Sequence, residues 1–166
     1  MIKIRKSTRS DIGVISHIYS QARTFMAEHG NPGQWGKTYP EDAIILSDIE
    51  SGHSYLCIDD DHPENHGAVA VFFFSEEGDS DYEKYPEIWK GGAGYGTIHR
   101  LASVTGKRGI ATFCVNECFK RCGNLKIDTH KDNLPMRRFL EKNGFELRGK
   151  VYVDGGKERL AYQKVL

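Results

Sequence analysis

The stretch at 106–111 reads Gly-Lys-Arg-Gly-Ile-Ala and stands where a strand-like pattern gives way to a helical one. Glycine has no Cβ, so the main chain there can approach a ligand closely. The free N–H groups at the start of a helix face outward, and the helix dipole favours an anion beside them. Because Lys107 and Arg108 add positive charge, this stretch predicts a binding site for a pyrophosphate.

Two familiar phosphate-binding motifs do not account for this loop. A Walker loop needs Gly-Lys followed by Ser or Thr after four spacer residues, and the loop lacks that sequence. A dinucleotide fingerprint needs its glycines between a strand and a helix. Gly92, Gly94 and Gly96 have a different spacing and precede a strand, so we interpret them as the end of a flexible loop.

The four cysteines offer little support for metal or redox chemistry. No CxxC pair occurs, which argues against a zinc site or a thioredoxin-like site. Cys114, Cys118 and Cys122 recur every four residues and therefore share one helix face. We interpret them as small buried apolar residues in a reducing compartment, and we expect no metal.

Charge is balanced over the chain but not along it. With 23 basic and 23 acidic residues, the formal net charge is zero. Residues 75–96 carry six acids and two lysines, a net charge of −4, whereas residues 100–150 carry twelve basic and five acidic residues, a net charge of +7. An acidic loop suits a cationic partner and a basic half suits an anionic one, but both patterns also fit plain solvated surfaces.

The basic half raises a nucleic-acid-binding module as an alternative class of protein. The sequence contains no basic-aromatic RNA motif and no recognition-helix signature, so we expect no nucleic acid partner. No apolar run approaches the roughly 20 residues of a membrane helix, and the N-terminus lacks the apolar stretch of a signal peptide. We therefore expect a cytoplasmic protein without membrane contact.

Hydrophobic periodicity and turn residues predict an alternating series of strands and helices. Thr8 followed by Asp11 resembles a capping box before the first helix, and Pro40 suits the first turn of the second. We expect strands at about 2–6, 55–58, 68–74, 97–104, 125–129, 151–153 and 160–165, and helices at about 12–28, 40–52, 110–121 and 135–143. This order predicts one α/β (α+β) domain over residues 1–166, with a mixed sheet.

Two blocks of the sequence resemble the GNAT superfamily of N-acetyltransferases. Residues 106–111 resemble its acyl-CoA loop, Q/R-x-x-G-x-G/A, with Gly109 and Ala111 in the small positions and Gly106 in place of the long first residue. The segment at 133–145, NLPMRRFLEKNGF, resembles the family's N-x-x-A-x-x-L-Y-E-K-x-G-F block and lies at the expected distance from the loop. The family's fold has a mixed, mostly antiparallel central sheet flanked by helices.

The resemblance implies that acetyl-CoA is the co-substrate and that a small amine is the acceptor. In the family two neighbouring strands separate, and the pantetheine arm lies between them; here these would be 97–104 and 125–129. One main-chain N–H of the first strand would polarise the thioester carbonyl. The implied cofactor-binding residues are Leu101, Ala102, Ser103, Gly106, Lys107, Arg108, Gly109, Ile110, Ala111 and Asn133.

The attacking amine must lose a proton, and three residues near the expected gap are candidates for the general base. His99 lies on the central strand, and Asp128 and His130 lie on or next to its neighbour; histidine titrates near neutral pH, which suits this role. Each residue also has a structural interpretation. His99 would pack or bond within the sheet, His130 would bond a loop or the cofactor, and Asp128 would pair with a basic side chain.

One position departs from the family. The tyrosine that protonates the leaving thiolate in GNAT enzymes corresponds to Leu140 here. Tyr152 or water would have to replace it, and we expect Leu140→Tyr to raise turnover. The departure also leaves open a catalytically weak or silent sensor that binds acyl-CoA.

The acceptor itself is not specified by the sequence. Polyamine, amino acid, antibiotic, peptide terminus and ribosomal protein all remain open, as does a homodimer. Aromatic residues in two loops are candidates for an acceptor pocket, with the acidic loop attracting a cation, although aromatic residues more often pack in cores. These residues are Trp35, Tyr39, Tyr85 and Trp89.

Overall fold

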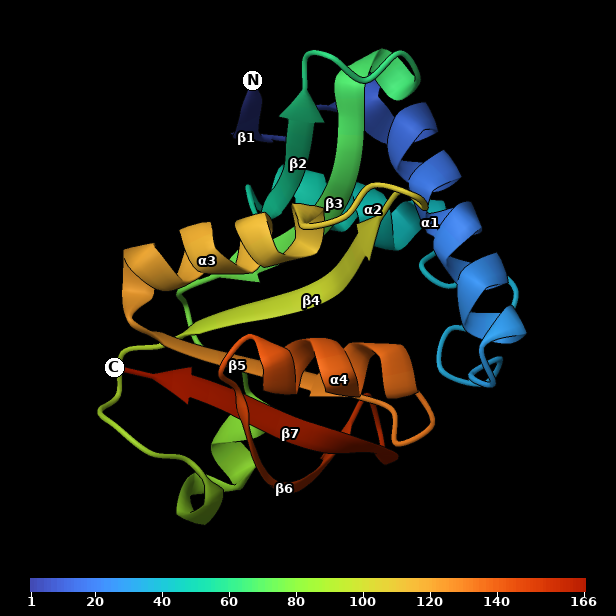
Figure 1. The fold of residues 1–166 in the computed structure, drawn as a ribbon. Coiled ribbons are helices and arrows are strands. Elements are labelled where there is room, and N and C mark those ends of the chain that lie inside the picture. The colour runs from blue at the N-terminus through green and yellow to red at the C-terminus, as the bar shows by residue number, and fades with distance from the viewer.

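A seven-stranded sheet runs through the computed structural model, which describes residues 1–166 (Figure 1). The strands lie in the order β1-β2-β3-β4-β5-β7-β6, and every neighbouring pair is antiparallel except β4 and β5. They are β1 (Ile2–Lys6), β2 (Ser54–Asp59), β3 (Ala68–Ser75), β4 (Gly96–Ser103), β5 (Asn124–Thr129), β6 (Glu146–Val153) and β7 (Lys157–Val165).

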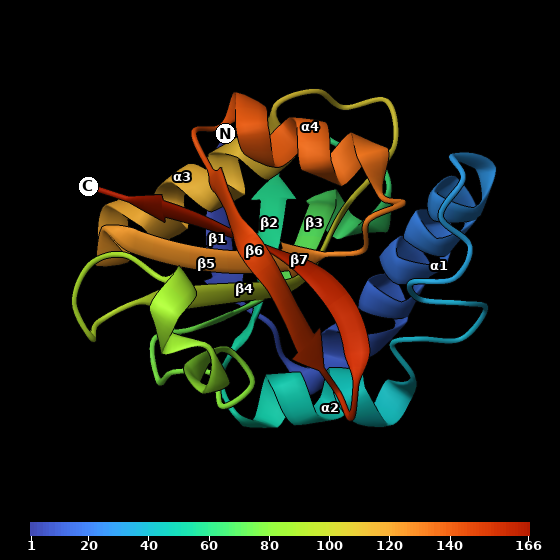
Figure 2. The same ribbon diagram turned by 90° about the horizontal axis from the view of Figure 1, so that it is seen from below.

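Four α-helices cover the two faces of the sheet. They are α1 (Ile12–Glu28), α2 (Asp42–Glu50), α3 (Ile110–Cys122) and α4 (Leu134–Lys142). In Figures 1 and 2, α3 and α4 lie on one face, and α1 and α2 lie on the other. The predicted fold class and the predicted order of elements are confirmed: this is an α+β fold around a mixed, mostly antiparallel sheet.

Local sequence signals explain several of the element boundaries. The backbone N–H of Thr8 donates to Asp11 Oδ2 at 2.7 Å, so the capping box forms, and a short 3-10 turn precedes α1. Helix α3 ends at Gly123, whose φ of 67° is left-handed. Helix α2 begins two residues later than predicted, because Pro40 lies outside it. Strands β6 and β7 are longer than predicted, because their backbone pairing continues past the apolar residues.

Two hydrophobic clusters hold the fold together. The larger one has 26 buried residues from the sheet and the helices that cover it, and it includes Cys57, Cys114 and Cys118. The smaller one has five buried residues and joins β6 and β7 to the segment before β4; they are Tyr82, Tyr95, Val151, Val153 and Ala161. The predicted acidic loop is therefore anchored on the C-terminal hairpin.

The parallel pair β4 and β5 separates soon after it forms. Only Gly96↔Leu125 and Thr97↔Lys126 pair between these strands. Beyond them Arg100, with a φ of 51°, interrupts the register of β4 against β3, and Figure 1 shows the two strands diverging towards their carboxyl ends. The edge of β4 that faces β5 therefore has no strand partner from Ile98 to Ser103.

Candidate active site

A cleft of about 1140 Å³ opens where β4 and β5 separate. Its walls come from both strands, from the loop at 33–41 and from the β6–β7 hairpin, whose tip reaches towards α2 in Figure 2. His99, Leu101, Asp128 and His130 all line it. The fold thus brings the three predicted base candidates to one cavity.

The glycine loop at the start of α3 has the geometry expected of an anion site. Gly106 and Gly109 have left-handed φ values of 82° and 84°, and a Cβ built on either would meet nothing within 4 Å. No side chain caps α3, and its first backbone bond joins the N–H of Phe113 to the carbonyl of Gly109. The N–H groups of Ile110 and Ala111 therefore have no helical acceptor. These features fit a bound pyrophosphate.

The two basic residues of this loop differ in their surroundings. Lys107 Nζ pairs with the buried carboxylate of Asp59, and this ammonium group lowers the pKa of Asp59. Lys107 therefore ties the loop to the end of β2, and the structure gives it a structural contact instead of a free charge. Arg108 is exposed and forms no ion pair, so it is the basic side chain of the loop that is free to meet a phosphate.

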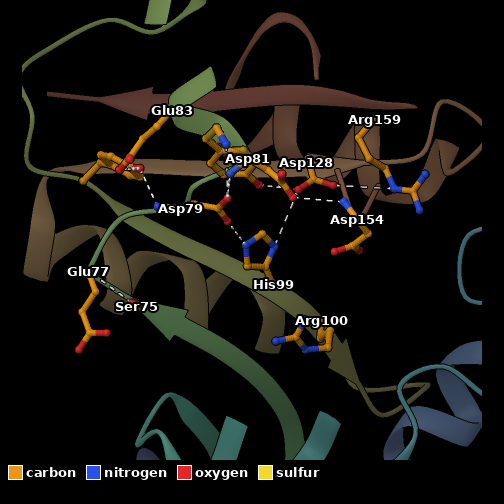
Figure 3. Close-up of polar contacts among 12 residues, drawn as sticks. Ser75, Glu77, Asp79, Asp81, Glu83, His99, Arg100, Asp128, Asp154 and Arg159 are labelled. Carbon is orange, nitrogen blue, oxygen red and sulfur yellow. Dashed lines mark hydrogen bonds and ion pairs between the residues drawn. The ribbon is translucent and has the colours of Figure 1, made fainter. Parts of the chain in front are cut away.

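His99 lies at the centre of a hydrogen-bonded acidic network (Figure 3). Its Nε2 is 2.7 Å from Asp79 Oδ2, and its Nδ1 is 3.8 Å from Asp128 Oδ2. Tyr82 donates its hydroxyl hydrogen to Asp128 Oδ2 at 2.5 Å. With Asp79 ionised, its bond requires the proton on Nε2, so a neutral His99 presents the lone pair of Nδ1. Such an imidazole can accept a proton.

The carboxyl groups of this network have opposite pKa shifts. Burial raises the pKa of Asp128, against the attraction of His99 and Arg159. Burial also acts to raise the pKa of Asp79, but the hydrogen bond and the charge of His99 outweigh it and lower this pKa. Asp79 is therefore the ionised partner of His99, while burial opposes the ionised form of Asp128.

Asn133 is engaged by the protein itself. Its Oδ1 accepts from the N–H of Met136 at 3.2 Å and caps α4. Its amide nitrogen donates to Gln34 Oε1 at 3.1 Å. Asn133 thus joins α4 to the loop at 33–41, and any contact of its buried side chain with a cofactor stays a prediction. Nearby, Thr129 Oγ1 is buried without a hydrogen-bond partner on the wall of the cleft.

The four aromatic candidates divide into two pairs. Trp35 and Tyr39 line the cleft, where Trp35 packs edge-on against Tyr19. Tyr85 and Trp89 do not line it: they pack against the smaller cluster, and Trp89 Nε1 donates to the carbonyl of Tyr82. The prediction that this second pair contacts the acceptor is therefore corrected, because the acidic loop folds onto the C-terminal hairpin.

The structure also corrects the predictions about the proton donor. Leu140 is fully buried in the main core and is absent from the cleft wall. A tyrosine at this position would have to displace core side chains before its hydroxyl met a ligand. Tyr152 is 46% exposed on β6 and does not line the cleft. Neither position supplies a hydroxyl to the cavity.

The acidic loop is not a free negative surface. Asp79 binds His99, Asp81 pairs with Lys84, and Glu76 pairs with Arg121. These three of its six acidic side chains thus have partners within the protein, and attraction of a cationic acceptor by the loop stays a prediction. No group of three His, Cys, Asp or Glu side chains is arranged to hold a metal ion, and none of the helices is both long and apolar enough to span a membrane.

Sequence reasoning missed several residues of the site. Asp79 is twenty residues before His99, and no spacing rule connects a loop carboxylate to a strand histidine at that distance. Gln34, which accepts from Asn133 and from the N–H of His130, stands in a glycine-rich segment with no motif. Arg159 on β7 is 3.9 Å from Asp128. Arg159 lies near Asp128 because β5 pairs with β7 and Asp128 stands opposite Ala161, two residues from Arg159.

A separated pair of parallel strands, a glycine loop at a helix start and helices on both faces of the sheet are the features of the GNAT fold (Figure 1). Comparison with solved structures supports this class. A GNAT-family acetyltransferase from Streptococcus agalactiae superposes with a TM-score of 0.85 and 27% identity, over 99% of this chain and 95% of that one. The chain belongs to the GNAT superfamily.

More distant structures share the fold. Arabidopsis thaliana NAA60 in complex with acetyl-CoA matches with a TM-score of 0.64 and 17% identity over the whole of both chains. A chain of the NatC complex bound to Gag peptide and CoA matches with a TM-score of 0.66 and 12% identity, over 99% of this chain and 98% of that one. No protein-family model matches the sequence, and no curated protein does.

Proposed function

We propose that residues 1–166 form a cytoplasmic N-acetyltransferase domain that moves an acetyl group from acetyl-CoA to a primary amine. One observation carries the proposal: the unpaired edge of β4 leads from the His99 network to the glycine loop of α3. Thioester and base would then meet on the same strand. The acetyl-CoA complex of NAA60, which has the same fold, supports this choice of donor.

The donor would be held mainly by backbone groups. The unpaired N–H groups at the start of α3 and the free Arg108 side chain would bind the pyrophosphate. The unpaired edge of β4 around Leu101 to Ser103 would bind the pantetheine amides as an added strand. An N–H of this edge would stabilise the oxyanion that forms on the thioester carbonyl. Acetyl-CoA supplies the activated acetyl group.

Proton transfer would begin at His99. Its Nδ1 takes a proton from the acceptor ammonium while Asp79 holds the other ring nitrogen at 2.7 Å. The freed amine attacks the thioester carbon in a ternary complex, the new C–N bond forms, and the C–S bond breaks. The nitrogen loses its second proton as the amide forms, and the thiolate takes up that proton through water, since no tyrosine hydroxyl of α4 reaches the cleft. His99 then releases its own proton to solvent.

The alternative is a sensor domain that binds acyl-CoA without efficient turnover, and the buried Leu140 favours it. Calorimetry with acetyl-CoA, followed by a turnover assay on a panel of primary amines, separates the two. We expect binding in the micromolar range and release of CoA with at least one class of amine. Tight binding without release of CoA would identify the sensor, and absence of binding at millimolar CoA would reject both functions.

A further inference from the structure

Arg159 is a charged side chain of the cleft that has few hydrogen-bond acceptors within the protein. Its side chain is 11% exposed, and it lines the cavity from β7. One nitrogen, Nη1, donates to the carbonyl of Glu158 at 2.8 Å, and this is the only protein hydrogen bond of a group that has five donor hydrogens. None of its nitrogens is among the buried atoms that lack a partner, so the donors without a protein partner are accessible to solvent or to a ligand.

The carboxylate of Asp128 does not satisfy this guanidinium. Arg159 Nε is 3.9 Å from Asp128 Oδ1, beyond hydrogen-bond distance. Arg100 in the same cleft shows what a complete pair looks like, since two of its nitrogens donate to the two oxygens of Asp48 at 2.8 Å each. A largely buried arginine that lacks such a two-point pair with a carboxylate is costly unless a ligand supplies an anion.

Arg159 and the predicted base both line the cleft, on either side of Asp128. Asp128 lies between them, with Oδ2 at 3.8 Å from His99 Nδ1 and Oδ1 at 3.9 Å from Arg159 Nε. Figure 3 shows the three side chains side by side. A molecule whose amine and carboxylate are separated by one or a few carbon atoms can therefore contact the imidazole and the guanidinium together.

We propose that the acceptor is a free amino acid, with its carboxylate on Arg159 and its amine directed at His99. This inference rests on the proposed acetyltransfer and specifies its substrate class. Lys131 and Lys157 line the same cleft and form no ion pair, so they add a positive field for an anionic group. Among the carboxylates of the cleft, Asp79 and Asp81 are already paired, whereas Glu41 and Asp154 form no ion pair, so a polyamine is the competing acceptor that the test must exclude.

The test compares each amino acid with its own carboxamide in the turnover assay. The carboxamide keeps the side chain and the amine but lacks the negative charge. Its amine is also less basic, so a preference for the acid cannot come from easier deprotonation. We expect the acid to have the lower KM, and we expect Arg159→Gln to raise that KM by about 10- to 100-fold, the loss of one charge-assisted contact.

Matched measurements separate recognition of the carboxylate from general damage. Arg159→Gln should leave the KM of the carboxamide and the affinity for acetyl-CoA unchanged, and Arg159→Lys should restore part of the loss. Lys142→Gln removes one charge from an exposed position outside the cleft and should change neither KM.

Two results would overturn the inference. Equal KM values for acid and carboxamide, or an equal loss for both in Arg159→Gln, would reject the amino acid while leaving acetyltransfer to another amine intact. Absence of turnover with every amine, together with no heat when amino acids are titrated into CoA-saturated protein, would reject the inference and the proposed function together.

Discussion

The most direct test of the proposed chemistry is to remove the base and its orienting carboxylate separately. His99→Gln keeps a polar side chain on β4 but cannot take a proton at neutral pH. General base assistance is typically worth about 10²–10⁴-fold, so kcat should fall by that factor. Asp79→Asn removes the charge that receives Nε2–H at 2.7 Å. A charge-assisted hydrogen bond is worth about 1.5–3 kcal/mol, so we expect a loss of about 10- to 100-fold.

The assay is CoA release at saturating acetyl-CoA and neutral pH, with kcat measured for the wild type and for both variants. Both variants should keep their affinity for acetyl-CoA in calorimetry. His17→Gln, at an exposed position on α1, is the matched control and should change nothing.

A folded His99→Gln variant with nearly full activity would refute this reasoning. The amine would then lose its proton to water or to another group of the cleft. Asp128→Asn would separate these cases, because loss of activity there would move the base from β4 to β5.

Three further predictions follow from the same structure. Gly109→Glu should abolish acetyl-CoA binding in calorimetry, because a negative side chain would enter the anion site. Gly109→Ala has the same backbone strain at a φ of 84° but no added charge, and it should still bind acetyl-CoA. An equal loss of binding in both variants would show that backbone strain is the cause. Asp128→Asn should raise the melting temperature at pH 7. Burial raises the pKa of Asp128, so the wild-type fold loses stability as pH rises from the usual carboxyl pKa through the raised one. The higher melting temperature of Asp128→Asn should therefore disappear below about pH 3, where the carboxyl group is protonated in both states. An equal increase in melting temperature at all pH values would contradict this prediction. Leu140→Tyr should lower the free energy of unfolding by about 1–3 kcal/mol through overpacking without raising turnover, and faster CoA release would show that the hydroxyl reaches the thiolate.

The sequence predicted the fold well because its signals are local. The apolar periodicity of α1 and the glycines that flank α3 each specify a helix and its end without reference to the rest of the chain. The block that begins at Asn133 was found in the same way, and Asn133 caps α4 through its own side chain. Such signals depend on neighbours within four residues, so a pattern can show them.

The site was less predictable because its contacts are long-range. Asp79 reaches His99 only because the acidic loop folds onto the C-terminal hairpin through Tyr82 and the cluster around it. For the same reason Tyr85 and Trp89 pack against this cluster and do not line the cleft. Composition indicated an acidic, aromatic loop, but it could not indicate which side chain faces the ligand and which packs beneath it.

The lack of a tyrosine acid should slow the reaction less than the lack of a base would, because the two proton transfers differ in free-energy cost. The amine of a free amino acid has a pKa of roughly 9–10, so its deprotonation at pH 7 costs about 3–4 kcal/mol. A thiol has a pKa of about 8.5, so release of a free thiolate at the same pH costs about 2 kcal/mol. The larger cost falls on the amine, where the fold provides His99, Asp79 and a buried carboxyl at Asp128. The smaller cost falls where Leu140 packs in the core. A site arranged in this way should be limited by its base, and an added acid at position 140 would relieve the lesser of the two costs.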